Sequence, residues 1–163
     1  MCTAVTYKTD HFYFGRTLDY DFSYCEEITF CPRIFRLSLR NGKRIDCHYA
    51  IIGMAYVKDG FPLYYDAVNE KGLCMAGLNF PENACYFPTR EDRVNITQFE
   101  LLPYILCKCE SVCEARELLA NIISLKPKVS ISLLIYQKYH SNEVGIALKI
   151  MSSKLFASSI ETE

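Results

Sequence analysis

Three strand-like segments separated by short turns restrict the possible folds more than any other part of the sequence. The first is a nearly continuous apolar run, which is typical of a strand buried on both faces. The turns between the segments, Lys-Asp-Gly and Asn-Glu-Lys-Gly, are too short for any connection other than an antiparallel one. The segments are residues 49–57, 63–68 and 73–79. We therefore predict an antiparallel meander within a β-sheet.

The flanking sequence predicts an α+β fold with further strands before the meander and two helices after it. Strands are expected at residues 2–7, 12–19, 27–31 and 35–39, the first two forming a hairpin. After a loop-like stretch, helical spacing indicates a helix at 99–109 that begins near Thr97, and a second at 111–121. The second helix opens with Ser111 and Glu114, the pattern of a capping box. No linker divides the 163 residues, so we expect a single domain over residues 1–163.

Composition excludes several classes of protein. A net charge of −1 with 23% charged residues gives no basic surface for nucleic acid or anionic lipid. No apolar run approaches the roughly 18 residues of a membrane span, and the polar start is unlike a signal peptide. Nine irregularly spaced cysteines, an odd number, argue against a secreted disulfide framework. We expect a cytoplasmic protein without nucleic-acid or membrane partners.

The cysteines also give little reason to expect a metal. The only cluster is Cys107, Cys109 and Cys113, which lacks paired C-x-x-C spacing and has no histidine nearby. Helix-lining cysteines that pack as small apolar side chains explain this spacing better. A thiol redox or metal protein is therefore the weakest of the possible classes.

Cys2 is the residue whose position points most directly to chemistry. If Met1 is removed, Cys2 carries both a thiol and a free α-amine, and an α-amine titrates at about 7.7–8.0. Such an amine can act as the base that activates its own side chain. The predicted hairpin brings Arg16 and Asp19 towards Cys2, where an arginine stabilises a thiolate and an aspartate orients an ammonium group. Alternatively, Cys2 is incidental and Arg16 with Asp19 forms an ordinary ion pair at a strand end.

Four motifs in one order resemble the choloylglycine hydrolase family, which contains bile salt hydrolases and penicillin V acylases. They are Met-Cys-Thr at residues 1–3, Phe-Gly-Arg-Thr-Leu-Asp at 14–19, Asn-Glu-Lys-Gly-Leu at 69–73 and Ala-Gly-Leu-Asn-Phe-Pro at 76–81. The resemblance implies an N-terminal-nucleophile hydrolase with an αββα sandwich, in which two antiparallel sheets lie between helical layers. It also implies hydrolysis of linear, non-peptide amide bonds without a metal or organic cofactor.

The resemblance assigns roles to residues of this chain. Cys2 corresponds to the nucleophile, Arg16 to the arginine beside the thiol and Asp19 to the aspartate that orients the amine. Asn79 corresponds to the asparagine whose side-chain amide forms part of the oxyanion hole. The aromatic loop at residues 20–25 and the segment around Phe61 lie where the family builds its substrate pocket. The pocket candidates are Tyr20, Tyr24 and Phe61, although core packing explains these side chains equally well.

The resemblance extends over residues 1–122 only, and family members are considerably longer than this chain. Residues 123–163 form a divergent tail with two apolar runs, 129–136 and 144–151, that are compatible with strands. A frameshifted or prematurely terminated gene is our hypothesis for this tail. We expect an incomplete sandwich with exposed apolar sheet surface, and slower turnover than in a complete member. Complete members are expected to be homo-oligomers, namely tetramers.

Three functions remain open at this point. Conjugated bile salts are the favoured substrates, because Asn-Phe-Pro at residues 79–81 and the aromatic loop fit them better. Penicillin V is the alternative small-molecule amide. A non-catalytic remnant that at most binds acyl or steroid-like ligands is the alternative of another class.

Overall fold

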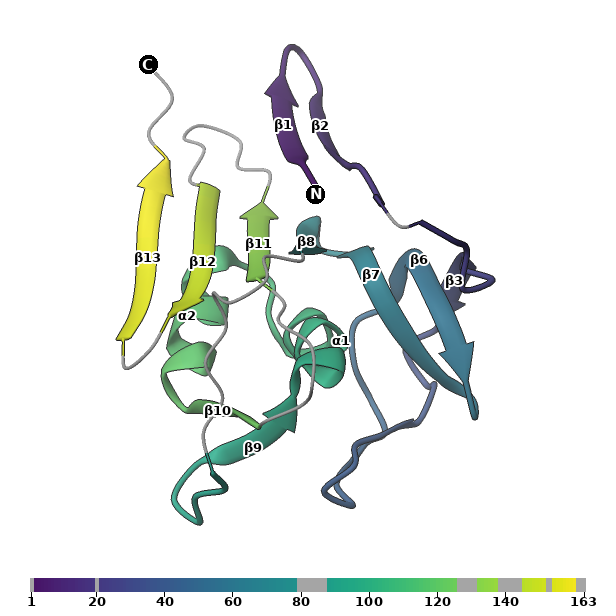
Figure 1. Cartoon of the computed structure of the whole chain (residues 1–163), viewed down its shortest axis with the longest axis vertical. Coiled ribbons are helices and arrows are strands. Elements are labelled where there is room, and N and C mark those ends of the chain that lie inside the picture. Colours follow the sequence, from purple (N-terminus) through teal and green to yellow (C-terminus); the bar gives the residue numbers. More distant parts are fainter. Residues whose placement is uncertain are drawn as a thin grey trace.

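The computed structural model describes residues 2–19, 21–78, 88–125, 132–137, 145–151 and 154–160, with side chains up to residue 122. Most described strands belong to one seven-stranded sheet of order β13-β12-β11-β8-β7-β6-β3, in which all neighbours are antiparallel. Its strands are β3 Glu27–Cys31, β6 Ile51–Lys58, β7 Phe61–Asn69, β8 Leu73–Leu78, β11 Ser132–Gln137, β12 Gly145–Met151 and β13 Lys154–Ile160. Figure 1 shows this sheet with the helices beneath it.

The predicted meander is confirmed as β6, β7 and β8, within a residue or two at each end. Both turns include a residue with positive φ where glycine is favoured, at Gly60 and Gly72. One feature of the meander was not predicted: the register between β6 and β7 shifts at Met54 and Ala55. This shift is a β-bulge in β7, which locally changes the face to which side chains point.

Both predicted helices are confirmed, as α1 Gln98–Lys108 and α2 Val112–Ala120. α1 packs against β7 and β8 and covers one face of the sheet (Figure 1). The core lies between this helix and the sheet, because side chains from both are almost fully buried there. It includes Ile51, Ala67, Leu73, Met75, Leu102, Ile105 and Leu106.

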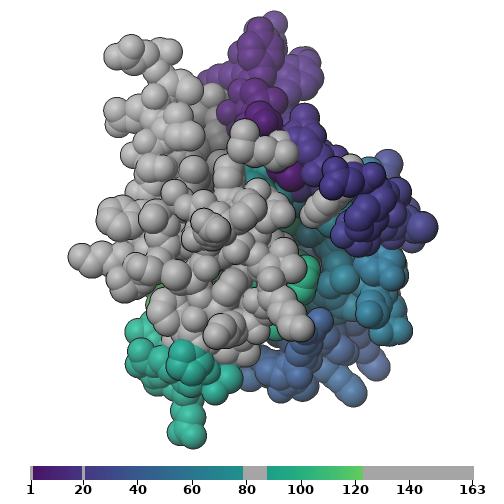
Figure 2. Space-filling view, in the orientation of Figure 1, coloured from purple at the N-terminus to yellow at the C-terminus, as the bar shows by residue number. Residues whose placement is uncertain are grey.

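Three smaller pairs of strands surround the main sheet. β1 Ala4–Lys8 and β2 Phe12–Arg16 form the predicted hairpin, β4 Leu37–Ser38 pairs with β5 Arg44–Ile45, and β9 Val94–Thr97 lies parallel to β10 Ile122–Leu125. In the space-filling view the hairpin (purple) and the region around β9 (green) lie at opposite ends of the molecule (Figure 2). The β9–β10 pair was not predicted, because a short parallel pair has little local sequence signal.

The two apolar runs of the tail are strands, as β11 and β12 largely coincide with them. β11 pairs directly with β8, so the backbone of the tail extends the sheet that the meander begins. β13 follows in a Ser-rich stretch that gave no strand signal and pairs with β12. These described strands place the tail in the same layer as the meander.

The face of the main sheet away from the helices is partly open, as expected for an incomplete sandwich. Ile28 and Phe30 of β3 are 74% and 60% exposed, and Ile52 of β6 is 45% exposed. Phe30 pairs with Ile52 across the two strands, so the exposed apolar surface is continuous. The β1–β2 hairpin lies over another part of this face, where Phe12 and Phe14 border a cavity together with Met54 and Val68.

Glu100 fixes the start of α1. Its carboxylate accepts hydrogen bonds from the Thr97 backbone N–H at 2.7 Å, the Thr97 hydroxyl at 2.8 Å and the Arg40 backbone N–H at 2.5 Å. Glu100 is 3% exposed, so these contacts are shielded from water. The side chain therefore closes a capping box and also ties the turn after β4 to the helix.

Replacing Glu100 with alanine is expected to lower the free energy of unfolding by about 2–3 kcal/mol, because a cap is lost and buried N–H groups lose their acceptor. Urea denaturation measures this change. Glu114→Ala is the matched control, since Glu114 also caps a helix start but accepts an exposed bond, from Glu110 N–H at 2.9 Å. A loss for Glu100→Ala no larger than for Glu114→Ala would contradict this role for Glu100.

Candidate active site

The β1–β2 hairpin puts Cys2 and Arg16 on one buried face. Ala4 pairs with Arg16, and the ladder continues to Thr3 and Thr17, where Thr17 N–H donates to the Thr3 carbonyl oxygen at 2.8 Å. Side chains alternate between the two faces of a strand, so those of Cys2, Ala4 and Arg16 share one face. Burial follows the same alternation, since Cys2 is 5% exposed whereas Val5 is 60% exposed.

Arg16 reaches from the hairpin to the main sheet. Its Nη2 donates to the Gly77 carbonyl oxygen at 2.5 Å and to the Tyr65 carbonyl oxygen at 3.5 Å. Its Nε lies 3.4 Å from Asp66 Oδ2, and its side chain is only 5% exposed. Both Nε and Nη1 are buried and make no hydrogen bond among the described residues. The guanidinium group is therefore held by the hydrogen bonds of Nη2 and by the ion pair with Asp66.

Asp19 is connected to the backbone next to Cys2 through Thr17. The Thr17 hydroxyl donates to Asp19 Oδ2 at 3.2 Å and accepts from the Thr3 backbone N–H at 3.0 Å. The Asp19 carboxylate is thus linked through the Thr17 hydroxyl group to the Thr3 backbone N–H, which follows Cys2 in the chain. Thr17 had no predicted role, and its only sequence signal was its position between Arg16 and Asp19 in the motif.

The other predicted site residues are distributed more widely. Asn79 and Tyr20 lie outside the described residues. The Tyr24 ring packs at 4.7 Å from the ring of Phe22 on the exposed loop between β2 and β3. Phe61 begins β7 and packs against the core, where it borders a cavity of about 400 Å³ together with Phe99. The structure therefore brings Cys2, Arg16 and Asp19 to one hairpin and puts Phe61 in a separate cavity.

Four other buried cysteines are poor candidates for a nucleophile. Burial raises the pKa of Cys74 and Cys109 to about 11, and it also raises the pKa of Cys31 and Cys107. A thiol rather than a thiolate therefore predominates at these positions near neutral pH, and the thiol is the unreactive form. These side chains serve the packing of the core.

A buried cysteine at position 2, on the same hairpin face as a fixed guanidinium group, is suited to nucleophilic attack on a carbonyl carbon. The family comparison agrees with this chemistry. The model of the linear amide C–N hydrolases, choloylglycine hydrolase family, matches residues 2–141. The chain belongs to the choloylglycine hydrolase family. The match includes residues beyond 122, where the recognisable motifs were expected to end.

Relatives in this family are bile salt and bile acid hydrolases. A bile salt hydrolase/transferase from Lactiplantibacillus plantarum is 50% identical over 117 residues, which are 72% of this chain and 36% of the relative. A bile salt hydrolase/transferase from Clostridium perfringens is 37% identical over 133 residues, 77% of this chain and 40% of the relative. This chain therefore spans well under half the length of these relatives.

Solved structures of the family share the fold. The C2A variant of the conjugated bile acid hydrolase from Clostridium perfringens matches with a TM-score of 0.88 and 29% identity, over 98% of this chain and 51% of that one. The penicillin V acylase from Agrobacterium tumefaciens matches with a TM-score of 0.74 and 16% identity, over 97% and 49%. The expected N-terminal-nucleophile hydrolase fold is confirmed, in an α+β chain that contains part of it.

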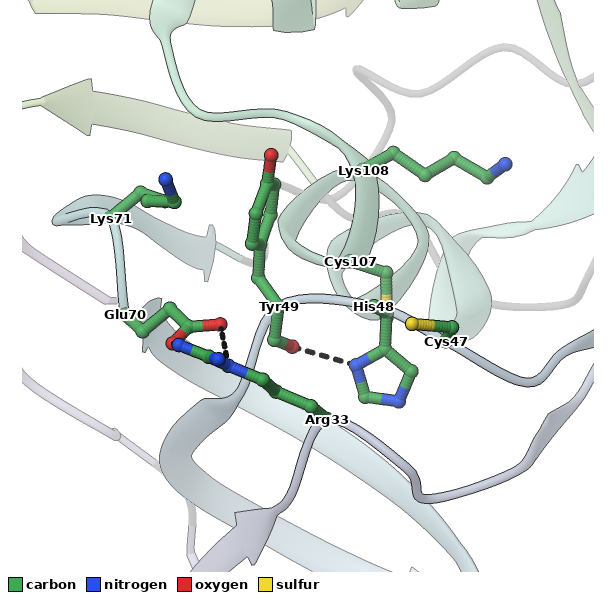
Figure 3. Close-up of a pocket in the computed structure, with 8 residues that line it drawn as sticks. All are labelled: Arg33, Cys47, His48, Tyr49, Glu70, Lys71, Cys107 and Lys108. Carbon is green, nitrogen blue, oxygen red and sulfur yellow. Dashed lines mark hydrogen bonds and ion pairs between the residues drawn. The ribbon is translucent and has the colours of Figure 1, made fainter.

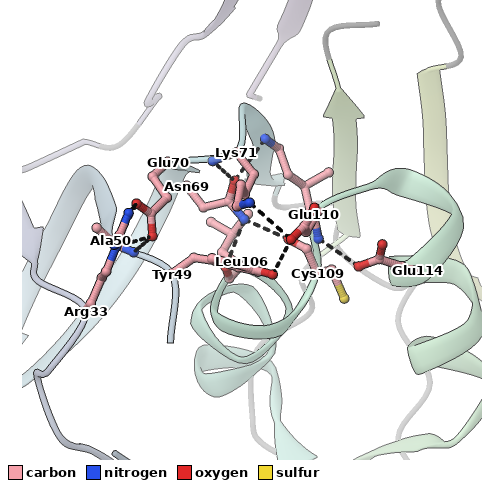
Figure 4. Close-up of polar contacts among 11 residues, drawn as sticks. Arg33, Tyr49, Ala50, Asn69, Glu70, Lys71, Leu106, Cys109, Glu110 and Glu114 are labelled. Carbon is pink, nitrogen blue, oxygen red and sulfur yellow. Dashed lines mark hydrogen bonds and ion pairs between the residues drawn. The ribbon is translucent and has the colours of Figure 1, made fainter. Parts of the chain in front are cut away.

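The family motif Asn-Glu-Lys-Gly-Leu has a structural role in this chain. Asn69, at the end of β7, donates from Nδ2 to the carbonyl oxygens of Leu106 at 2.9 Å and Cys109 at 2.8 Å. Its Oδ1 accepts from the backbone N–H groups of Lys71 and Leu73, both at 3.0 Å. Figure 4 shows these bonds linking the β7–β8 turn to the end of α1. The motif thereby joins the sheet to the helical layer.

A cavity of about 650 Å³ lies next to this turn and is separate from the Cys2 hairpin. Figure 3 shows Arg33 paired with Glu70 on one side, and the His48 ring hydrogen-bonded to the Tyr49 carbonyl oxygen. The second His48 nitrogen lies 2.8 Å from the Phe35 carbonyl oxygen. Arg33 lowers the pKa of Glu70 by hydrogen bonding. The polar groups that border this cavity largely satisfy one another, so we assign no ligand to it.

The described residues contain no group of His, Cys, Asp or Glu side chains arranged to hold a metal ion. Neither α1 nor α2, the helices of the described part, is long and apolar enough to cross a membrane.

Proposed function

We propose that this chain hydrolyses the linear amide bond of glycine- or taurine-conjugated bile salts, with Cys2 as an N-terminal nucleophile. The observation that carries the proposal is the shared buried face of Cys2 and Arg16 on the hairpin. Identity of 50% to a bile salt hydrolase/transferase supports the choice of substrate. The link from Asp19 through Thr17 to the Thr3 N–H supports an oriented chain start.

The proposed reaction requires the removal of Met1. The freed α-amine of Cys2 accepts the thiol proton, and the thiolate attacks the amide carbonyl carbon. The carbonyl oxygen becomes an oxyanion, to which the Asn79 side-chain amide donates; such donors contribute on the order of 2.7–4 kcal/mol in comparable sites. The C–N bond then breaks, and the ammonium group returns its proton to the leaving amine. Water hydrolyses the resulting thioester, which releases the bile acid and restores Cys2.

Arg16 and Asp19 support this reaction without being consumed. The positive charge of Arg16 favours the thiolate. Asp19 orients the α-ammonium group through its position at the end of the hairpin. The proposed pocket residues are Tyr20, Tyr24 and Phe61. Phe61 can contact the substrate only if the substrate extends towards the cavity that Phe61 borders.

Penicillin V is the second candidate substrate, because the same thiol chemistry cleaves its side-chain amide. The two substrate classes are separated by incubating the purified chain with a glycine conjugate, a taurine conjugate and penicillin V. Ninhydrin detects released glycine, taurine or 6-aminopenicillanic acid. Faster amine release from the bile salt conjugates than from penicillin V supports the proposal. Release from penicillin V alone would instead assign penicillin V as the substrate.

We also propose a cytoplasmic location for this chain, and a homo-oligomeric assembly for complete members of the family only. The described cysteines are all free, which fits a reducing compartment. A tetramer was expected for complete members only. Sedimentation velocity on the purified chain gives its assembly directly, and a monomer would exclude the homo-oligomer for this chain.

A further inference from the structure

The bulge in β7 turns Asp66 towards the hairpin. Ala55 pairs with Tyr64 and Met54 pairs with Asp66, so the β6–β7 register shifts by one residue at Tyr65. Because of this extra residue, Tyr64 and Ala67 both face the core, at 7% and 5% exposure. Asp66, which pairs with Met54, faces the opposite side of the sheet. Bulges often occur next to active sites, where they redirect a side chain.

Gly53 allows this bulge. It pairs with Ala67, and a Cβ atom added to Gly53 would overlap the Asp66 carbonyl oxygen and the Ala67 Cα atom. A backbone approach this close has no room for a side chain. The direction of Asp66 therefore depends on a local backbone arrangement that only glycine permits at residue 53.

Asp66 meets Arg16 in a largely buried environment. Asp66 Oδ2 lies 3.4 Å from Arg16 Nε, and the two side chains are 26% and 5% exposed respectively. The pKa of Asp66 is raised, because the effect of burial exceeds the opposing effects of the Arg16 charge and of the Met54 N–H, 3.5 Å from Oδ1. The contact with the guanidinium group offsets part of the cost of burying this carboxylate.

Two kinds of contact hold the Arg16 guanidinium group. Nε forms the ion pair with Asp66, and Nη2 donates to the Gly77 and Tyr65 carbonyl oxygens. Within the described part of the chain, the buried Nε and Nη1 make no hydrogen bond, whereas a purely structural arginine would be expected to satisfy its buried donors. The Arg16 side chain lies on the buried hairpin face that it shares with Cys2.

We propose that Asp66 is a positioning residue, whose carboxylate fixes the Arg16 guanidinium group so that Arg16 stabilises the Cys2 thiolate. This inference rests on the proposed function of Cys2 as the nucleophile. Asp66 had no role in the sequence prediction, and its only signal was an acidic residue inside an otherwise apolar strand. The bulge at Tyr65 and the space at Gly53 explain how it reaches Arg16.

The test compares the rate at which iodoacetamide alkylates Cys2 in wild type and in Asp66→Asn, Asp66→Glu and Asp46→Asn. Digestion and mass spectrometry resolve the Cys2 peptide from the other cysteines. Asp66→Asn is expected to slow alkylation at neutral pH by about tenfold, because a loosely held guanidinium group stabilises the thiolate less. Asp66→Glu is expected to give an intermediate rate. Asp46→Asn is the control, since it breaks an exposed pair with Arg36 at 3.5 Å and is expected to leave the rate unchanged.

A positioning role and simple charge removal give opposite results. If Asp66 only neutralised part of the Arg16 charge, Asp66→Asn would leave Arg16 more positive and would accelerate alkylation of Cys2. An unchanged or faster alkylation rate in Asp66→Asn overturns the proposal. If Asp66→Asn does not fold by circular dichroism, Asp66→Glu decides: a folded variant that reacts at the wild-type rate also overturns it. In an Arg16→Gln background, the Asp66→Asn change is expected to have no further effect on alkylation.

Hydrolysis provides a second measurement for folded variants. A displaced guanidinium group is expected to lower kcat by up to about 100-fold with little change in KM, since misplacement by about 1 Å has effects of this size. Alkylation requires no substrate. A wild-type chain that releases no amine but shows the expected alkylation rates would refute the proposed hydrolysis alone. Intact hydrolysis with unchanged alkylation in Asp66→Asn would refute the role of Asp66 alone.

Discussion

Replacing Cys2 with alanine is expected to abolish the proposed release of glycine or taurine from conjugated bile salts, with a fall in turnover of at least roughly 10⁴-fold. The effect is large because the other buried thiols cannot replace Cys2. Cys31, Cys74, Cys107 and Cys109 are buried and have raised pKa values. Ninhydrin detection of the released amino acid measures the change.

The control for this variant is Cys113→Ala. Cys113 is exposed on α2, outside the candidate site, and alanine is a good helix former. Its turnover is expected to equal that of the wild type. If Cys2→Ala kept most of the wild-type turnover, Cys2 would not be the nucleophile; if the wild type released no amine at all, the non-catalytic alternative would gain support.

Asn69→Asp is expected to destabilise the fold by about 3–5 kcal/mol, the largest effect on stability that we predict. The change keeps the shape of the side chain but replaces a donor of two hydrogen bonds by an oxygen. This oxygen would face the carbonyl oxygens of Leu106 and Cys109, from which Asn69 Nδ2 lies 2.9 and 2.8 Å away. Asn69 is 3% exposed, so water cannot restore the lost bonds. A loss of this size is a large part of the stability of a typical domain.

Urea denaturation with a structural probe measures this loss. Asn41→Asp is the matched control, because Asn41 also donates to a carbonyl oxygen, that of Asn95 at 3.0 Å, but from the exposed turn between β4 and β5. Its expected loss is below about 1 kcal/mol, since water replaces an exposed bond. Equal losses for the two variants would show that Asn69 does not link the turn to α1.

Local sequence patterns were sufficient to predict the helices and strands that are determined by residues close together in the chain. The meander was predicted from its apolar runs and glycine turns, and both helices from the caps at Thr97 and Ser111. These features depend on residues within a few positions of one another. The pairs β1–β2 and β6–β7–β8 followed because their turns are short.

Features that depend on distant residues were not predicted. The parallel pair β9–β10 joins segments separated by two helices. The bulge at Tyr65 requires Gly53 on the neighbouring strand, so neither residue alone indicates it. Thr17 and Asp66 entered the site through contacts with Thr3 and Arg16 that only the fold brings about. The roles of Cys2, Arg16, Asp19 and Asn79 came from the family resemblance and stay predictions for this chain.

The intact mass of the purified chain tests the central claim, that Cys2 is an N-terminal nucleophile. The account predicts a single species lighter than the encoded sequence by one methionine residue, because only the removal of Met1 gives Cys2 the free α-amine that serves as its base. A chain that retains Met1 would contradict the account, since Cys2 would then carry an amide nitrogen without basic character.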